Sequence, residues 1–157
     1  MEDLKSITVG QVLERGAAQV PGKTAVVDGS SRKTFDELNR TTDALATALA
    51  DIGLKKGDRA AIYMKNSFEL MVAFYALQKL GVIAVWVNAI YRKNESEFIL
   101  NNSEARAVFI FSEWEGHDYL GDALNIKKNS ATLENIILVG DGEGSGVYSF
   151  YDLIAAG

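Results

Sequence analysis

Cysteine is missing from this sequence, and histidine and proline each occur only once among its 157 residues. Without cysteine the chain can form no disulfide, no thiolate zinc site and no cysteine nucleophile. The single histidine, His117, excludes a metal site that needs two imidazole ligands. These absences leave carboxylates, hydroxyls, lysine and arginine as the groups available for chemistry.

Positive charge is also scarce, because the sequence has 16 Lys and Arg residues against 21 Asp and Glu residues, which gives a net charge of −5. This acidic balance argues against electrostatic binding to nucleic acid or to anionic lipid. The longest apolar run, Leu70–Leu77, is far shorter than the ~20 residues of a membrane-spanning helix. The polar start at 1–6 does not resemble a signal peptide. We therefore expect a cytoplasmic protein with no membrane span and no nucleic-acid partner.

The sequence does contain a regular alternation of helical and extended patterns. An amphipathic segment at 8–20 precedes two short extended runs around the turn Gly29–Ser31, which predicts a helix and then a β-hairpin. Strands are then expected at 59–64, 82–87, 106–111 and 136–139, and helices at 35–52, 68–80, 95–102, 119–124 and 149–155. Strands that alternate with helices predict an α/β fold with a mainly parallel sheet flanked by helices on both faces, plus the N-terminal β-hairpin.

Several residues predict where these elements begin and end. Thr34 and Glu37 have the spacing of a capping box, Asn66 or Ser67 can cap the next helix, and Gly81 can end it. The run Val82–Val87 is apolar throughout, as in a parallel strand that is covered on both faces. Trp86 is accordingly expected in the core.

Two segments could carry chemistry but are better explained as surface loops. The glycine-rich run Gly140–Gly146 follows a strand but has neither the dinucleotide nor the P-loop spacing, and it contains no lysine to hold a phosphate. Glu113, Glu115, His117 and Asp118 are a possible set of hard metal ligands, yet they lack the spacing of a recognised metal motif. We predict no metal site and no catalytic residue here.

In an open parallel sheet, ligands bind beyond the carboxyl ends of the strands. In this sequence those ends lead into 65–66, 88–92, 112–114 and the glycine-rich loop. Any ligand site is therefore expected among these four segments.

Five stretches, in this order along the chain, resemble the amino-terminal part of the adenylate-forming enzymes, a superfamily that includes acyl-CoA synthetases, luciferases and peptide-synthetase adenylation domains. The run Lys33–Arg40 is similar to the family's first core motif, and Asn66–Leu70 with Leu77–Asn88 is similar to the second. The matching stretches are Ala17–Val27, Lys33–Arg40, Gly53–Ile62, Asn66–Leu70 and Leu77–Asn88.

This resemblance implies a two-step reaction for a complete enzyme, in which a carboxylate and ATP form an acyl-adenylate and CoA then displaces AMP. ATP, CoA and Mg²⁺ are the implied cofactors, and a carboxylic acid is the implied substrate. Because the resemblance is greatest to fatty-acid–CoA ligases, the implied acid is a fatty acid. Residues 1–157 are expected to be the first part of the AMP-binding large domain, ending before the phosphate-binding loop. On this view the chain alone is inactive, binds no cofactor, and has the rest of the large domain and a carboxy-terminal domain as partners.

One pair of site residues follows from the resemblance. In some CoA ligases the loop after the second core motif lines the CoA side of the cleft, and here that loop is Asn88–Arg92. Asn88 and Arg92 are the implied substrate contacts, since an arginine fork suits a phosphate. The family often has proline where this chain has Ala89.

Two alternatives remain open. The chain could be part of another adenylate-forming enzyme, such as a peptide-synthetase adenylation domain or a luciferase-like enzyme. It could also be a stand-alone α/β interaction module without catalysis. If the chain is a piece of the large domain, the loss of the remainder is expected to expose apolar surface, and the chain is expected to self-associate.

Overall fold

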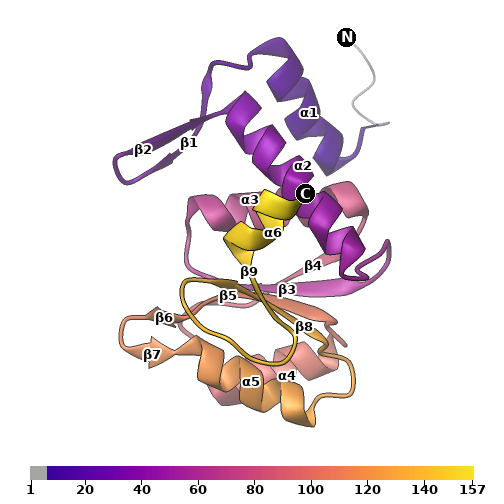
Figure 1. Cartoon of the computed structure of the whole chain (residues 1–157), viewed down its shortest axis with the longest axis vertical. Coiled ribbons are helices and arrows are strands. Elements are labelled where there is room, and N and C mark those ends of the chain that lie inside the picture. The colour runs from indigo at the N-terminus through magenta and orange to yellow at the C-terminus, as the bar shows by residue number, and fades with distance from the viewer. Residues whose placement is uncertain (1–6) are drawn as a thin grey trace.

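The computed structural model describes residues 7–157, so the acidic start at 1–6 lies outside the described residues. Its centre is a five-stranded parallel sheet with the strand order β4-β3-β5-β8-β9 (Figure 1). These strands are β3 (Arg59–Tyr63), β4 (Ile83–Trp86), β5 (Ala107–Phe111), β8 (Asn135–Val139) and β9 (Val147–Ser149). The predicted α/β fold with a mainly parallel sheet is confirmed.

Helices cover both faces of this sheet. On one side lie α1 (Val9–Gln19), α2 (Phe35–Asp51), α3 (Phe68–Leu80) and α6 (Phe150–Ala156), and on the other lie α4 (Lys93–Asn102) and α5 (Tyr119–Asn129) (Figure 1). Strand residues alternate between the two cores, as Ala60 and Ile62 face the α2/α3 side while Ala61 and Tyr63 face the α4/α5 side. This is the two-residue period of a strand that is buried on both faces.

The hairpin and the first capping box form as predicted. Strands β1 (Thr24–Asp28) and β2 (Ser31–Thr34) pair antiparallel, and α2 begins directly after them. The Thr34 hydroxyl accepts a bond from the Glu37 N–H at 3.2 Å, and the Thr34 N–H donates to the Glu37 carboxylate at 2.8 Å. These reciprocal bonds satisfy two backbone donors that the first turn would otherwise leave unpaired. The hydrogen bonds that the Glu37 carboxylate accepts from the Thr34 N–H and the Thr34 hydroxyl lower the pKa of Glu37 below its usual value.

Replacing Thr34 with alanine should therefore destabilise the protein by about 1 kcal/mol, the usual cost of a lost N-cap. Thr34→Ser keeps the acceptor oxygen and should stay close to the wild type. Urea denaturation followed by circular dichroism measures both variants. Equal stabilities of the two variants would show that the cap contributes nothing.

Two expectations about strands are wrong. β4 is the edge strand of the sheet, so Ile83 and Trp86 are 54% and 55% exposed instead of being covered on both faces. Trp86 packs on Phe74 of α3 on one side only, with the ring centroids 5.4 Å apart. A fifth parallel strand, β9, was not predicted, and it pairs with β8 over three residues. The chain also forms a small antiparallel pair, β6 (Glu113–Trp114) with β7 (His117–Asp118).

No helix among residues 7–157 has the length and hydrophobicity that crossing a membrane requires.

Candidate functional site

A cleft of about 780 Å³ lies beyond the carboxyl ends of β3 and β4. Lys65 and Asn66 line it after β3, Trp86 and Asn88 line it at the end of β4, and Trp114 of β6 closes the far side. Three of the four predicted segments thus contribute to one cleft. Because this is the edge of the sheet where open α/β folds bind ligands, we take the cleft as the candidate site.

Residues Asn88–Tyr91 form one wall of this cleft, and the loop Asn88–Arg92 folds into a tight turn. The Asn88 carbonyl oxygen accepts a hydrogen bond from the Tyr91 N–H at 3.0 Å. The Asn88 side-chain oxygen accepts another from the Ile90 N–H at 3.1 Å, which is the local bonding that favours asparagine in turns. Of the two predicted contact residues, Asn88 lines the cleft and Arg92 does not.

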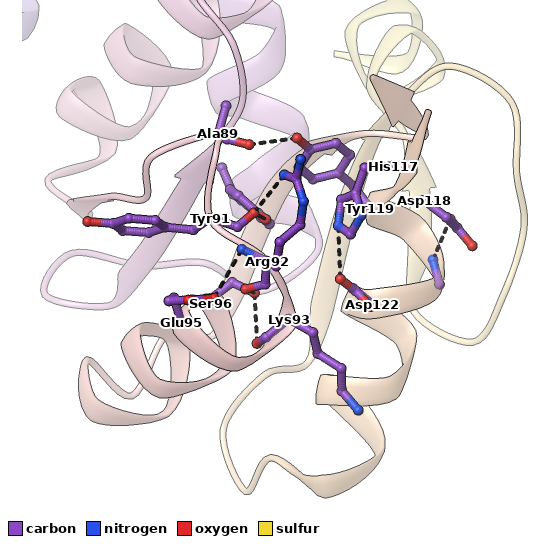
Figure 2. A network of polar contacts seen from close by, with 12 residues as sticks. Ala89, Tyr91, Arg92, Lys93, Glu95, Ser96, His117, Asp118, Tyr119 and Asp122 are labelled. Atoms are coloured by element: carbon purple, nitrogen blue, oxygen red, sulfur yellow. Dashed lines mark hydrogen bonds and ion pairs between the residues drawn. The ribbon is translucent and has the colours of Figure 1, made fainter. Parts of the chain in front are cut away.

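Arg92, the second predicted contact, is directed at its own loop. Its Nη1 donates to the carbonyl oxygens of Ile90 at 3.1 Å and Tyr91 at 3.2 Å. Its backbone N–H donates to the Glu95 carboxylate at 3.2 Å, and this bond helps to start α4 (Figure 2). Arg92 thus stabilises the turn in this conformation, and it would have to rotate outward to reach a phosphate.

Two buried tyrosines hold the loop from below. The Tyr119 hydroxyl donates to the Ala89 carbonyl oxygen at 2.6 Å (Figure 2). The Tyr63 hydroxyl donates to the Tyr91 carbonyl oxygen. The two rings meet edge to face, with centroids 4.9 Å apart. Burial raises the pKa of Tyr63 to about 12, and burial also raises that of Tyr119. Both hydroxyls therefore stay protonated at neutral pH and remain donors.

Replacing Tyr119 with phenylalanine removes one of these donors and leaves the buried Ala89 carbonyl oxygen unpaired. We expect a loss of about 1–3 kcal/mol in stability, the cost of an unsatisfied buried polar group. Faster hydrogen exchange at 88–92 should accompany it. Tyr151→Phe is the matched control, because its hydroxyl bonds Glu69 at the surface. An equal effect of the two variants would contradict the assigned role of Tyr119.

His117 takes part in this support of the loop. Its Nε2 lies 3.0 Å from a carboxylate oxygen of Asp122 on α5, and its ring stacks edge to face on Tyr119 (Figure 2). Asp118 caps α5 by accepting a bond from the Gly121 N–H at 2.8 Å. Within residues 7–157 no three His, Asp or Glu side chains converge as metal ligands. The sequence pattern does not indicate Asp122 as the partner of His117, because Asp122 lies outside the acidic cluster Glu113–Asp118.

The glycine-rich loop has the character of the surface turn that was predicted. Residues 140–145 are exposed, and Gly140, Gly142 and Gly146 have positive φ angles that favour glycine. Lys127 of α5 donates to the Ser145 carbonyl oxygen at 2.7 Å. The loop is therefore tethered to the helix layer and does not line the cleft beside Asn88.

Comparison with known proteins decides the family. A family model described as "AMP-binding enzyme" matches residues 13–149 of the chain. The chain belongs to this family. The relationship agrees with the motifs at 33–40 and 77–88, which form the start of α2 and the α3–β4 connection.

Relatives of this AMP-binding chain include ligases for aryl acids and for fatty acids. The 2,3-dihydroxybenzoate-AMP ligase of Bacillus subtilis is 29% identical over 136 residues, which are 87% of this chain and 25% of the relative. A medium/long-chain-fatty-acid–CoA/3-oxocholest-4-en-26-oate–CoA ligase of Mycobacterium tuberculosis is 27% identical, over 97% of this chain and 28% of the relative. The chain thus spans about a quarter of the length of these curated relatives.

Solved structures agree with this assignment. The anthranilate CoA ligase AuaEII in complex with anthranoyl-AMP is similar with a TM-score of 0.85 at 28% identity, over 95% of this chain and 28% of that chain. This AMP-binding chain therefore shares its fold with that ligase over most of its length. The expected adenylate-forming fold is confirmed.

Proposed function

We propose that the chain is the amino-terminal part of the large domain of an ATP-dependent acid–CoA ligase. The proposed reaction of the whole protein joins a carboxylic acid to AMP, with release of pyrophosphate, and then transfers the acyl group to CoA. The observation that supports it most is the family match over 13–149, together with a fold shared with a ligase bound to an acyl-adenylate. We further propose that the chain alone does not catalyse this reaction and that the protein works in the cytoplasm.

The proposed acid is a medium- to long-chain fatty acid, with an aryl acid as the second candidate. Of the relatives that match most of the chain, one is named as a ligase of an aryl acid and another as a ligase of fatty acids. The cleft itself mixes apolar walls from Trp86, Ile90 and Trp114 with the polar groups of Lys65 and Asn88. Such a site could accommodate the apolar or the polar part of an acyl-CoA, so the acid has to be determined by assay.

Asn88 and Arg92 are the proposed contacts on the CoA side. Asn88 would use its amide N–H groups, since its side-chain oxygen is occupied by the Ile90 N–H. Arg92 would exchange its bonds to two loop carbonyls for bonds to a phosphate, which it can bind in a bidentate manner. Because residues 7–157 bring no three metal-ligating side chains together, we assign none of them to the Mg²⁺ that the reaction requires.

The test compares this chain with the product of the complete reading frame that encodes it. Both are incubated with ATP, Mg²⁺, CoA and an acid panel of decanoate, palmitate, anthranilate and 2,3-dihydroxybenzoate, and pyrophosphate and thioesters are quantified. We expect acid-dependent pyrophosphate release and an acyl-CoA from the complete product, and no release from the chain alone.

Three results would contradict the proposal in different ways. Turnover by the chain alone would show that its proposed inactivity is wrong. An acyl group carried on a protein thiol instead of CoA would indicate another type of adenylate-forming enzyme. A complete product that releases no pyrophosphate with any acid would favour a non-catalytic module.

A further inference from the structure

The edge strand β4 has the sequence of an interior strand. Positions 82–87 contain only apolar residues, yet Ile83 and Trp86 are more than half exposed. Edge strands are usually protected from further pairing by a charge, a proline or a bulge. β4 has none of these, and its register with β3 is regular from Ile83 to Trp86. A strand of this kind at an open edge indicates that something pairs with it.

The backbone groups of β4 point to the same conclusion. The N–H groups of Ile83 and Val87 donate to carbonyl oxygens of Asp58 and Ile62, on the β3 side, at 2.8 and 3.1 Å. Because successive residues of a strand alternate in direction, the N–H and C=O groups of Ala84 and Trp86 face away from β3. The open edge therefore presents two donors and two acceptors that can pair with a further strand.

The connections within the sheet show where a further strand would lie. The step from β3 outward to β4 uses α3, on the α2/α3 face. The steps in the opposite direction, from β4 to β5 and from β5 to β8, use α4 and α5 on the other face. These three connections therefore have the same handedness, as nearly all crossover connections between parallel strands do. In this sheet, a connection through a helix on the α2/α3 face therefore leads to a strand that lies on the β4 side of the strand it leaves.

Helix α6, which follows β9, lies on the α2/α3 face. Its Phe150 and Leu153 belong to the same core as Leu45 and Leu49 of α2 (Figure 1). By the rule above, a parallel strand that follows α6 in this sheet lies on the β4 side of β9. All positions between β9 and β4 are filled, so the first open position is the edge of β4.

The course of α6 agrees with a return in that direction. The Tyr151 hydroxyl donates to the Glu69 carboxylate at 2.6 Å, which ties the start of α6 to the first turn of α3. Gly157 lies against the backbone of Ala44 and Ala48 in α2, where a side chain would not fit. The end of α6 therefore lies against α2, on the same face of the sheet as α3.

We infer that the segment following Gly157 in the longer protein supplies a parallel strand that pairs with β4. Its backbone bonds the outward groups of Ala84 and Trp86, and its apolar side chains cover Ile83 and Trp86. The strand extends the sheet to at least six strands with β4 in the interior. This inference rests on the part of the proposed function that makes the chain a piece of a larger domain, as its coverage of 25–28% of the relatives suggests.

Residue-resolved hydrogen exchange by NMR tests the pairing. In this chain alone, the amides of Ala84 and Trp86 should exchange rapidly, while those of Val85 and Val87 are protected by β3. In the product of the complete reading frame, the amides of Ala84 and Trp86 should exchange at least about tenfold more slowly than in the chain alone, because a paired amide exchanges only when the strand opens. Val85 and Val87 are the internal controls, since they are protected in both proteins.

Three outcomes would overturn the inference. The first is rapid exchange of Ala84 and Trp86 in the complete product. The second is protection that grows with protein concentration, which would assign the β4 edge to a second copy of the protein. The third is a stop codon directly after Gly157. Exchange needs no turnover, so a protected but inactive protein would contradict only the proposed reaction, and an active protein with an open β4 edge would contradict only this inference.

Discussion

The variant Phe109→Ala should lose about 3–5 kcal/mol of its free energy of unfolding, the usual cost of truncating a buried aromatic ring. Phe109 lies at the centre of β5, between β3 and β8, and none of its surface is exposed. Its ring belongs to the core beneath α2 and α3. Because whole domains are stable by only about 5–15 kcal/mol, this single change should remove a large share of the protein's stability.

Chemical denaturation with tryptophan fluorescence and circular dichroism measures the loss. Phe98→Ala is the matched control, because the Phe98 side chain is 69% exposed on α4. We expect the control to change stability by no more than about 0.5 kcal/mol, as is usual for surface substitutions. A similar loss in both variants would mean that Phe109 is not at the centre of the core.

The second large effect is expected at Asp58, where a carboxylate is buried next to the start of β3. Its side chain accepts hydrogen bonds from the Lys55 N–H at 3.0 Å and from Arg106 Nη1 at 2.8 Å. Arg106 also donates to Glu134, and these contacts, Glu134 chiefly, raise the pKa of the guanidinium. The network thus connects the turn before β3 with the starts of β5 and β8, three neighbouring strands.

Asp58→Ala should reduce stability by about 2–4 kcal/mol, because it leaves the Lys55 N–H unpaired and removes one of the two carboxylates around Arg106. Asp36→Ala is the control, since Asp36 pairs with Arg40 at 2.6 Å on an exposed helix face. That exposed pair should contribute less than about 1 kcal/mol. Urea denaturation at two salt concentrations compares them, and equal losses would contradict the structural role assigned to Asp58.

Much of the fold could be predicted because it depends on local signals. Thr34 with Glu37 and Ser67 with Gly81 mark the ends of two helices, and the structure places both helices there. These signals act within one turn of the chain, through hydrogen bonds between near neighbours, so sequence alone is sufficient to read them. The helix at 119–124 was predicted too short, because α5 continues to Asn129.

The candidate site was predicted only in outline. The rule that ligands lie beyond the carboxyl ends of parallel strands identified Lys65, Asn88 and Trp114, which share one cleft. The groups that shape the cleft were missed, because Tyr63 and Tyr119 bond loop carbonyls that are 28 and 30 residues away in sequence. A tyrosine at the end of a buried strand signals that its hydroxyl needs a partner, but the pattern does not identify that partner.

The sequence by itself determined the class of the fold, the ends of α2 and α3, the hairpin and the family, because periodicity, caps and ordered motifs are properties of neighbouring residues. Only the tertiary structure decided the order of the strands. An apolar run such as Val82–Val87 shows that a strand is suited to burial, but its place in the sheet depends on which distant strands pair with it. For the same reason Trp86 is exposed at the sheet edge, and Arg92 bonds its own loop instead of facing the cleft.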